Sequence, residues 1–144
     1  MSDKDTEKLL RQCSTGLKMG VTAIDETVSM VKSTDLKNTL QESKTDHVQL
    51  SNEADELLSE ISVESAEPGA IAKGMSWFKT HLMITMVPSD STVAELITDG
   101  CNLGIKTINK TLNDCENADD KSRKIAQKLI ELDKKLALDV SPYL

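Results

Sequence analysis

Apolar residues recur along most of the chain at alternating steps of three and four positions, which is the spacing of one face of an α-helix. No stretch alternates with a period of two, as a half-buried strand would. The pattern therefore predicts an all-α protein. The predicted helices span residues 3–32, 34–62, 70–86, 91–116 and 120–140, and together they form one domain over residues 1–144.

Each of the four long helices carries its own apolar stripe. The stripe of the second helix is a leucine-rich seam that also contains Ser43 and His47. A heptad-like seam of this kind packs helices into bundles. The other stripes are Leu10, Cys13, Leu17, Gly20, Val21, Ile24, Val28 and Val31 in the first helix, Val93 or Ala94, Ile97, Cys101, Gly104, Ile105, Ile108, Leu112 and Cys115 in the third long helix, and Ile125, Leu129, Leu132, Leu136 and Val140 in the last.

The connections predict how these helices are arranged. Short turns join the first two long helices and the last two, so each pair should form an antiparallel hairpin. The segment 70–86 lies between Pro68-Gly69 and Pro88, and as a helix it would be about 26 Å long. It can therefore carry the chain back along the bundle, which predicts an up-down-down-up arrangement with one helical crossover.

Two glycine pairs indicate an internal repeat. Gly16 and Gly20 each lie 84 residues before Gly100 and Gly104. Glycine within a helix is unfavourable by about 1 kcal/mol relative to alanine. A matching Gly-x-x-x-Gly in both halves therefore suggests that helices approach closely at equivalent places, around an approximate twofold axis. The alternative is a chance alignment of two heptad-like patterns.

Composition and charge exclude several classes of partner. Acidic residues outnumber basic ones by 24 to 17, and the net charge is −7. This balance disfavours nucleic acids and anionic membranes, which both attract cationic proteins. No apolar run approaches the roughly 20 residues of a membrane span, and no secretory signal opens the chain. We therefore predict a cytoplasmic protein whose three cysteines, Cys13, Cys101 and Cys115, are reduced core thiols.

A family resemblance rests on the helix order, the crossover and the run Gly74-Met75-Ser76-Trp77-Phe78-Lys79. Together these features resemble a bacterial branch of the ferritin-like superfamily, relatives of rubrerythrin, to which no activity is assigned. The resemblance covers nearly the whole chain. It implies a ferritin-like four-helix bundle with the crossover as fifth helix, and a stress-related setting. Members of the wider superfamily use the bundle core for di-iron oxidation chemistry.

That chemistry can be tested against the residues. A di-iron bundle needs a Glu from each of two helices and a Glu-x-x-His motif from each of the other two. Here His47 lies in its seam, but Lys44 stands three residues earlier in place of a glutamate. The other acidic candidates lie beside the predicted stripes: Asp25, Glu26, Glu95, Asp99 and Glu131. The sequence therefore predicts no di-iron centre and no bound cofactor.

His47 has two interpretations. It is either a hydrogen-bonded core histidine that fixes the register of the bundle with Ser43, or a remnant ligand for one metal ion or a haem. We favour the first, because a polar residue in an apolar seam requires a partner. A group of methionines and a histidine could suggest Cu(I), but core filling accounts for it better. That group is Met75, His81, Met83 and Met86.

We therefore expect a non-catalytic structural or interaction protein, and enzymatic activity is not favoured. The alternative is a metal- or haem-binding oxidoreductase that uses unorthodox ligands around His47. A second line on the crossover helix, Trp77, His81 and Ile84, stands off its core-facing stripe. Tryptophan is enriched among interface hot spots, so this line predicts the contact surface of a twofold homodimer. Alternatively, both lines are buried within one chain.

Overall fold

The computed structural model describes residues 2–65, 68–83 and 88–144, and gives only the backbone of residues 2, 3 and 77. Within these residues the chain forms α1 (Ser2–Thr27), α2 (Thr34–Glu60), α3 (Pro68–Met83), α4 (Asp90–Asp114) and α5 (Asp120–Val140). Two 3₁₀ turns, η1 (Val28–Met30) and η2 (Ser141–Tyr143), follow α1 and α5. The chain thus turns more tightly after Thr27 than a continuous helix over residues 3–32 would.

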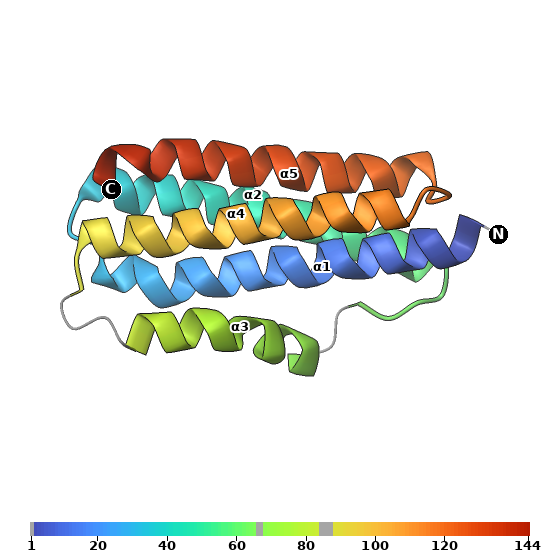
Figure 1. Cartoon of the computed structure of the whole chain (residues 1–144), viewed down its shortest axis with the longest axis horizontal. Helices are drawn as coiled ribbons and strands as arrows, with labels where there is room; N and C mark the ends of the chain where they lie inside the picture. The colour runs from blue at the N-terminus through green and yellow to red at the C-terminus, as the bar shows by residue number, and fades with distance from the viewer. Residues whose placement is uncertain (1, 66–67, 84–87) are drawn as a thin grey trace.

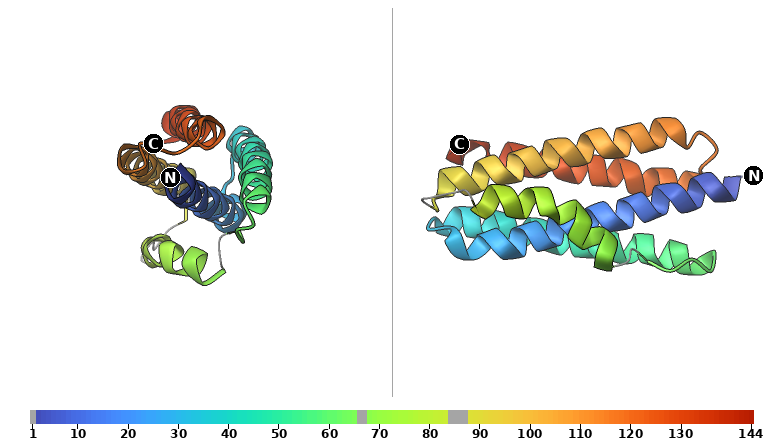
Figure 2. Two further views of the ribbon diagram at one scale, coloured as in Figure 1. Left: turned by 90° about the vertical axis from the view of Figure 1, so that its right-hand side faces the viewer. Right: turned by 60° about the horizontal axis from the view of Figure 1, so that its bottom comes forward.

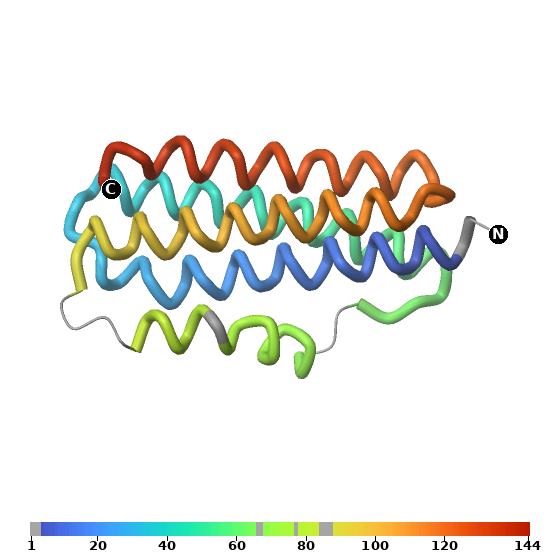
Figure 3. The backbone as a smooth tube through the Cα atoms, viewed as in Figure 1, coloured from blue at the N-terminus to red at the C-terminus, as the bar shows by residue number. Residues whose placement is uncertain are grey.

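The four long helices form a bundle, and α3 lies outside it next to α1 (Figures 1 and 2). The helices α1 and α2 run in opposite directions, as do α4 and α5, whereas α2 and α4 run in the same direction (Figure 1). The tube in Figure 3 shows that α3 carries the chain from the end of the first hairpin back along the bundle to the start of the second. The predicted all-α bundle with up-down-down-up topology and a helical crossover is confirmed.

The crossover helix packs on α1 and α4 through one small apolar cluster. Its buried members are Met75 and Phe78 of α3 and Leu96 of α4, and Met19, Ala23, Ile71 and Leu82 pack around them. Ile71, Met75, Phe78 and Leu82 therefore form the face of α3 that packs on the bundle. A Cβ at Gly74 would lie 2.6 Å from Met19 Sδ, so the missing side chain lets α3 approach α1 closely.

The apolar core has two parts, which follow one another along the bundle. One part includes Leu17, Leu50, Ile108 and Ile130. The other includes Ile24, Leu40, Cys101 and Leu136. Between these parts, each long helix passes through a position without an apolar side chain: Gly20 in α1, His47 in α2, Gly104 in α4 and Asp133 in α5. We call these four residues the polar layer.

The buried positions of the two hairpins correspond to one another. In α1 and α4 the offset is 84 residues: Leu9, Leu10, Cys13, Leu17, Ile24, Thr27 and Val31 match Val93, Ala94, Ile97, Cys101, Ile108, Thr111 and Cys115. In α2 and α5 the offset is 86 residues: Leu36, Leu40, Ser43, His47, Leu50 and Ala54 match Ser122, Ala126, Leu129, Asp133, Leu136 and Val140. This register supports the approximate twofold suggested by the glycines, with a longer loop in the second hairpin.

Each hairpin also caps the loop of the other. Asp90, the first residue of α4, accepts hydrogen bonds from the backbone N–H groups of Lys32 and Ser33 at 2.7 and 3.1 Å. At the other end of the bundle, Asp5 and Thr6 of α1 each accept a backbone N–H of the α4–α5 loop at 2.9 Å. These contacts satisfy N–H groups that would otherwise lack a protein partner, and they tie the two hairpins together at both ends.

Replacing Asp90 with alanine should lower the free energy of unfolding by about 1–2 kcal/mol, because two N–H groups of the α1–α2 loop lose a charged acceptor. Urea denaturation followed by circular dichroism measures this loss. Asp99→Ala is the matched control, since Asp99 is exposed in the middle of α4, and it should not lower stability. An equal loss in both variants would contradict the capping role.

Candidate functional site

His47 lies near the middle of α2 and is buried between the hairpins, with 3 % of its surface exposed. Its Nδ1 lies 2.7 Å from the backbone carbonyl oxygen of Ser43, one turn earlier, and 3.3 Å from Ser43 Oγ. A carbonyl oxygen can only accept a hydrogen bond, so Nδ1 carries a proton and donates it to this oxygen. The backbone of α2 thus fixes the ring and leaves Nε2 to face α5.

Asp133 faces His47 from α5 and is 8 % exposed. Its Oδ1 lies 3.6 Å from His47 Nε2, which is an ion-pair distance and longer than a hydrogen bond. Burial raises the pKa of the Asp133 carboxyl, and the contact with His47 opposes that rise. With Nδ1 protonated, the pair is neutral when it holds one further proton, either on Nε2 or on the Asp133 carboxyl. Neutrality matters because an unpaired charge at this depth is strongly unfavourable.

Two glycines provide the space that this pair occupies. A Cβ at position 20 would lie 2.6 Å from His47 Cδ2 and 2.8 Å from His47 Nε2. A Cβ at position 104 would lie 2.5 Å from Asp133 Oδ2. Gly100, by contrast, would meet nothing within 4 Å. Gly20 and Gly104 therefore allow the backbones of α1 and α4 to approach the two polar side chains.

Asp133 was not among the site residues predicted from the sequence. The predicted stripe of the last helix passed through Leu132, whereas the structure buries Asp133 and leaves Leu132 half-buried. Glu131, the acidic residue of α5 that was considered, is exposed, and Asp133 was not considered. The chain did contain the signal, because a step of four from Leu129 and a step of three back from Leu136 both reach Asp133. Asp133 also matches His47 between the two halves.

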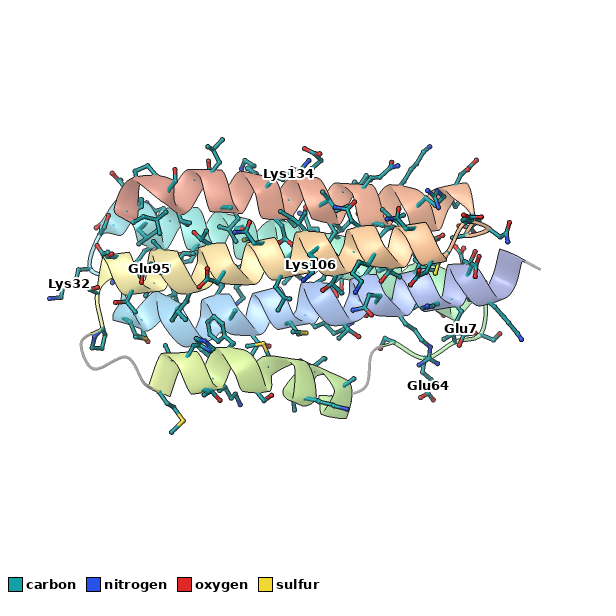
Figure 4. All side chains as sticks on the ribbon, in the orientation of Figure 1. Glu7, Lys32, Glu64, Glu95, Lys106 and Lys134 are labelled. Atoms are coloured by element: carbon teal, nitrogen blue, oxygen red, sulfur yellow. The ribbon has the colours of Figure 1, made fainter. Side chains whose placement is uncertain are left out.

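The acidic residues that were considered as ligands lie away from the polar layer. Asp25 pairs with Lys44 at 2.6 Å between α1 and α2, and both side chains are about half exposed. Glu26 is half-buried, and its carboxylate lies 4.0 Å from the ammonium of Lys79 on α3. Three others are exposed: Glu95, Asp99 and Glu131. Figure 4 shows Glu95 among the charged side chains on the outside of the bundle.

The sulfur-containing residues of the described part of the chain do not form a common site, and several of them fill space in the core. Cys13 and Cys101 are buried, and burial raises the pKa of the Cys13 thiol to about 12. Burial and the neighbouring Asp133 also raise the pKa of the Cys101 thiol. Since the reactive and metal-binding form is the thiolate, these thiols are suited to packing. Met75 is 2 % exposed and Met83 is 86 % exposed, so they do not face a common site.

The predicted contact line on α3 is only partly described. His81 is half-buried near the end of α3. Ile84, Met86 and the side chain of Trp77 lie outside the described residues, so the use of this line as an interface stays a prediction.

A second polar cluster joins α1 and α2. Ser14 Oγ donates to Asp55 Oδ1 at 2.7 Å, and Lys18 Nζ donates to Ser14 Oγ at 2.7 Å. Lys18 Nζ also donates to both Asp55 carboxylate oxygens, at 2.9 and 2.7 Å. A nucleophilic serine needs a free base beside it, and here the lysine is held in an ion pair. The cluster therefore fastens the two helices of the first hairpin.

The described residues offer little chemistry for a metal or a membrane. Across residues 2–65, 68–83 and 88–144, no group of three or more His, Cys, Asp or Glu side chains is placed to hold a metal ion. Within the same ranges, no helix combines the length and the apolarity needed to cross a bilayer. The polar layer supplies one imidazole and one carboxylate, with glycine at its other two positions.

Comparison with known proteins identifies the fold. No family model and no curated protein matches the sequence. Among solved structures, the chain is similar to the bacterioferritin-related protein from Bacteroides fragilis, which is described as a dodecameric thioferritin. The TM-score is 0.75 at 11 % sequence identity, over 97 % of this chain and 84 % of that chain. This chain therefore has the ferritin-like fold, as the family resemblance implied.

Gly20→Ala and Gly104→Ala should each lower the free energy of unfolding by about 1–3 kcal/mol, because the new methyl group overlaps His47 or Asp133. Gly100→Ala is the matched control and should raise stability by up to about 1 kcal/mol, the gain in helix propensity. Urea denaturation of the three variants measures both effects. A gain in all three would show that the polar layer is not closely packed.

Proposed function

We propose that this chain is a non-catalytic structural or interaction protein of the cytoplasm, built on the ferritin-like fold. The observation that carries this proposal is the make-up of the polar layer, where two of four long helices contribute glycine. A stress-related setting rests on the family resemblance alone. The buried, protonated thiols are consistent with a reducing compartment.

The middle of the bundle does not supply the ligands of a di-iron site at the described positions. Two irons require carboxylates from all four helices, because these bridge the hard cations and balance their charge. At the polar layer, α1 and α4 offer Gly20 and Gly104. The positions three residues before His47 and Asp133 hold Lys44 and Ile130. One carboxylate cannot take the place of four.

The alternative is an oxidoreductase with a metal ion or a haem bound at His47. Such a site needs the lone pair of Nε2 to point toward open space. Instead Nε2 faces Asp133, and Gly20 packs against the imidazole ring. No observation in the described residues favours this alternative, and a ligand at His47 would first have to separate the two hairpins.

Self-association is part of the proposal. The similar protein from Bacteroides fragilis is described as dodecameric, which supports assembly of several copies of this chain. The predicted line Trp77, His81 and Ile84 on α3 is the proposed contact surface, since α3 lies on the outside of the bundle (Figure 2).

Protein purified without a polyhistidine tag should contain far less than one iron per chain. Inductively coupled plasma mass spectrometry measures this content, before and after incubation with ferrous iron and removal of the excess. The His47→Gln variant is the control and should bind the same trace amount. Two irons per wild-type chain, retained after dialysis against a chelator, would overturn the non-catalytic proposal.

Trp77→Glu should convert the assembled wild-type protein into a folded smaller species, because a buried charge disrupts an apolar interface. Multi-angle light scattering gives the mass, and circular dichroism checks the fold. Ala72→Glu, at another exposed position of α3, is the control and should keep the wild-type mass. A wild type that is monomeric at high micromolar concentration would contradict the proposed self-association.

A further inference from the structure

The two polar side chains at the centre of the bundle occupy equivalent places in its two halves. His47 and Asp133 are related by the same offset of 86 residues that relates the other buried positions of α2 and α5. The glycines that face them, Gly20 and Gly104, are related by the offset of α1 and α4. The internal twofold therefore brings together two equivalent sites with unlike chemistry, a histidine on one hairpin and a carboxylate on the other.

We propose that His47 and Asp133 determine hairpin pairing: they favour the pairing of the α1–α2 hairpin with the α4–α5 hairpin over the pairing of two like hairpins. Most of the other equivalent pairs join one small or apolar residue to another, such as Leu50 with Leu136, and such contacts do not distinguish one hairpin from the other. The caps at the bundle ends accept backbone N–H groups, which the loops of both hairpins supply, so they distinguish the two hairpins less. At the centre, by contrast, an ionisable side chain from each hairpin is buried against the other.

The physical basis is the difference between unlike and like pairs in a buried site. An imidazole facing a carboxylate is neutral with one shared proton, as described above. Two α4–α5 hairpins would bury two carboxylates, and two α1–α2 hairpins would bury two imidazoles. The first combination carries excess negative charge at neutral pH, and the second has no carboxylate to balance a protonated ring. Like hairpins are therefore disfavoured, within one chain and between two copies.

The surroundings add little that could replace this contact. On α2, Ser43 binds His47 Nδ1, and Lys44 is engaged with Asp25 outside the centre. On α4, Cys101 is the titratable neighbour of Asp133, and burial raises the pKa of its thiol so that it stays neutral. The opposing positions on α1 and α4 are the two glycines. Discrimination thus rests on the one imidazole and the one carboxylate.

The decisive experiment exchanges the two residues in the full-length chain. His47→Asp leaves two carboxylates at the centre, Asp133→His leaves two imidazoles, and the double variant H47D/D133H restores an unlike pair in reversed positions. Gly104 should accommodate a histidine at position 133 as Gly20 accommodates His47. Urea midpoints are measured for all four proteins, with light scattering to monitor association.

Each single variant should lose stability, and the double variant should be more stable than the sum of the two single losses predicts. If the double variant loses as much stability as the two single variants together, or more, the proposal is overturned and the two side chains only fill space. If neither single variant folds, the double variant decides alone: a folded bundle supports the matching role, and an unfolded one refutes it.

The pH dependence separates electrostatic matching from a purely steric effect. Acidification from neutral pH should raise the urea midpoint of His47→Asp relative to wild type, because protonation removes the repulsion between two buried carboxylates. Acidification should lower the midpoint of Asp133→His, because a proton on either buried imidazole then leaves a positive charge with no carboxylate beside it. The double variant should follow the wild-type profile. Parallel profiles in all four proteins would contradict the proposal.

Discussion

The contact between His47 and Asp133 imposes the main constraint on this bundle. Both groups are buried between two apolar cores, where a lone charge or an unpaired polar atom would be strongly unfavourable. Each group therefore needs the other, and the ring also needs the Ser43 carbonyl oxygen. These requirements fix the axial register of α2 against α5. They also leave no free space for a side chain at positions 20 and 104, which accounts for the two glycines.

This arrangement separates the ferritin-like fold from the chemistry for which the fold is known. The bundle depends on apolar layers on either side of its middle, and these layers are intact here. The middle itself can hold any set of groups that is neutral and fits the space. In this chain an imidazole, a carboxylate and two glycines meet both conditions, so the described residues keep the architecture without placing the six ligands of a di-iron site.

The sequence predicted the fold well because helical periodicity is a strong signal over helices of more than twenty residues. The crossover could be located because Pro68, Gly69 and Pro88 interrupt the helical pattern on either side of it. Prediction failed at Asp133, where a choice between adjacent residues decides which one is buried. Leucine was the natural choice on hydrophobicity, but the angular position of residue 133 between Leu129 and Leu136 determines the outcome. The partner of His47 comes from a helix 86 residues away, and no local pattern could reveal that distance.

The way α3 is attached has a consequence for how the molecule opens. The four long helices share extensive cores and reciprocal caps, whereas α3 packs on them through the small cluster around Met75, Phe78 and Leu96, beside the Lys79–Glu26 ion pair. Separating α3 from α1 and α4 would expose this cluster and leave the polar layer and both cores intact. The protein should therefore have two levels of protection against amide hydrogen exchange. Amides of α3 should exchange through a partial opening, while those in the middle of α2 and α5 should exchange only when the whole bundle unfolds.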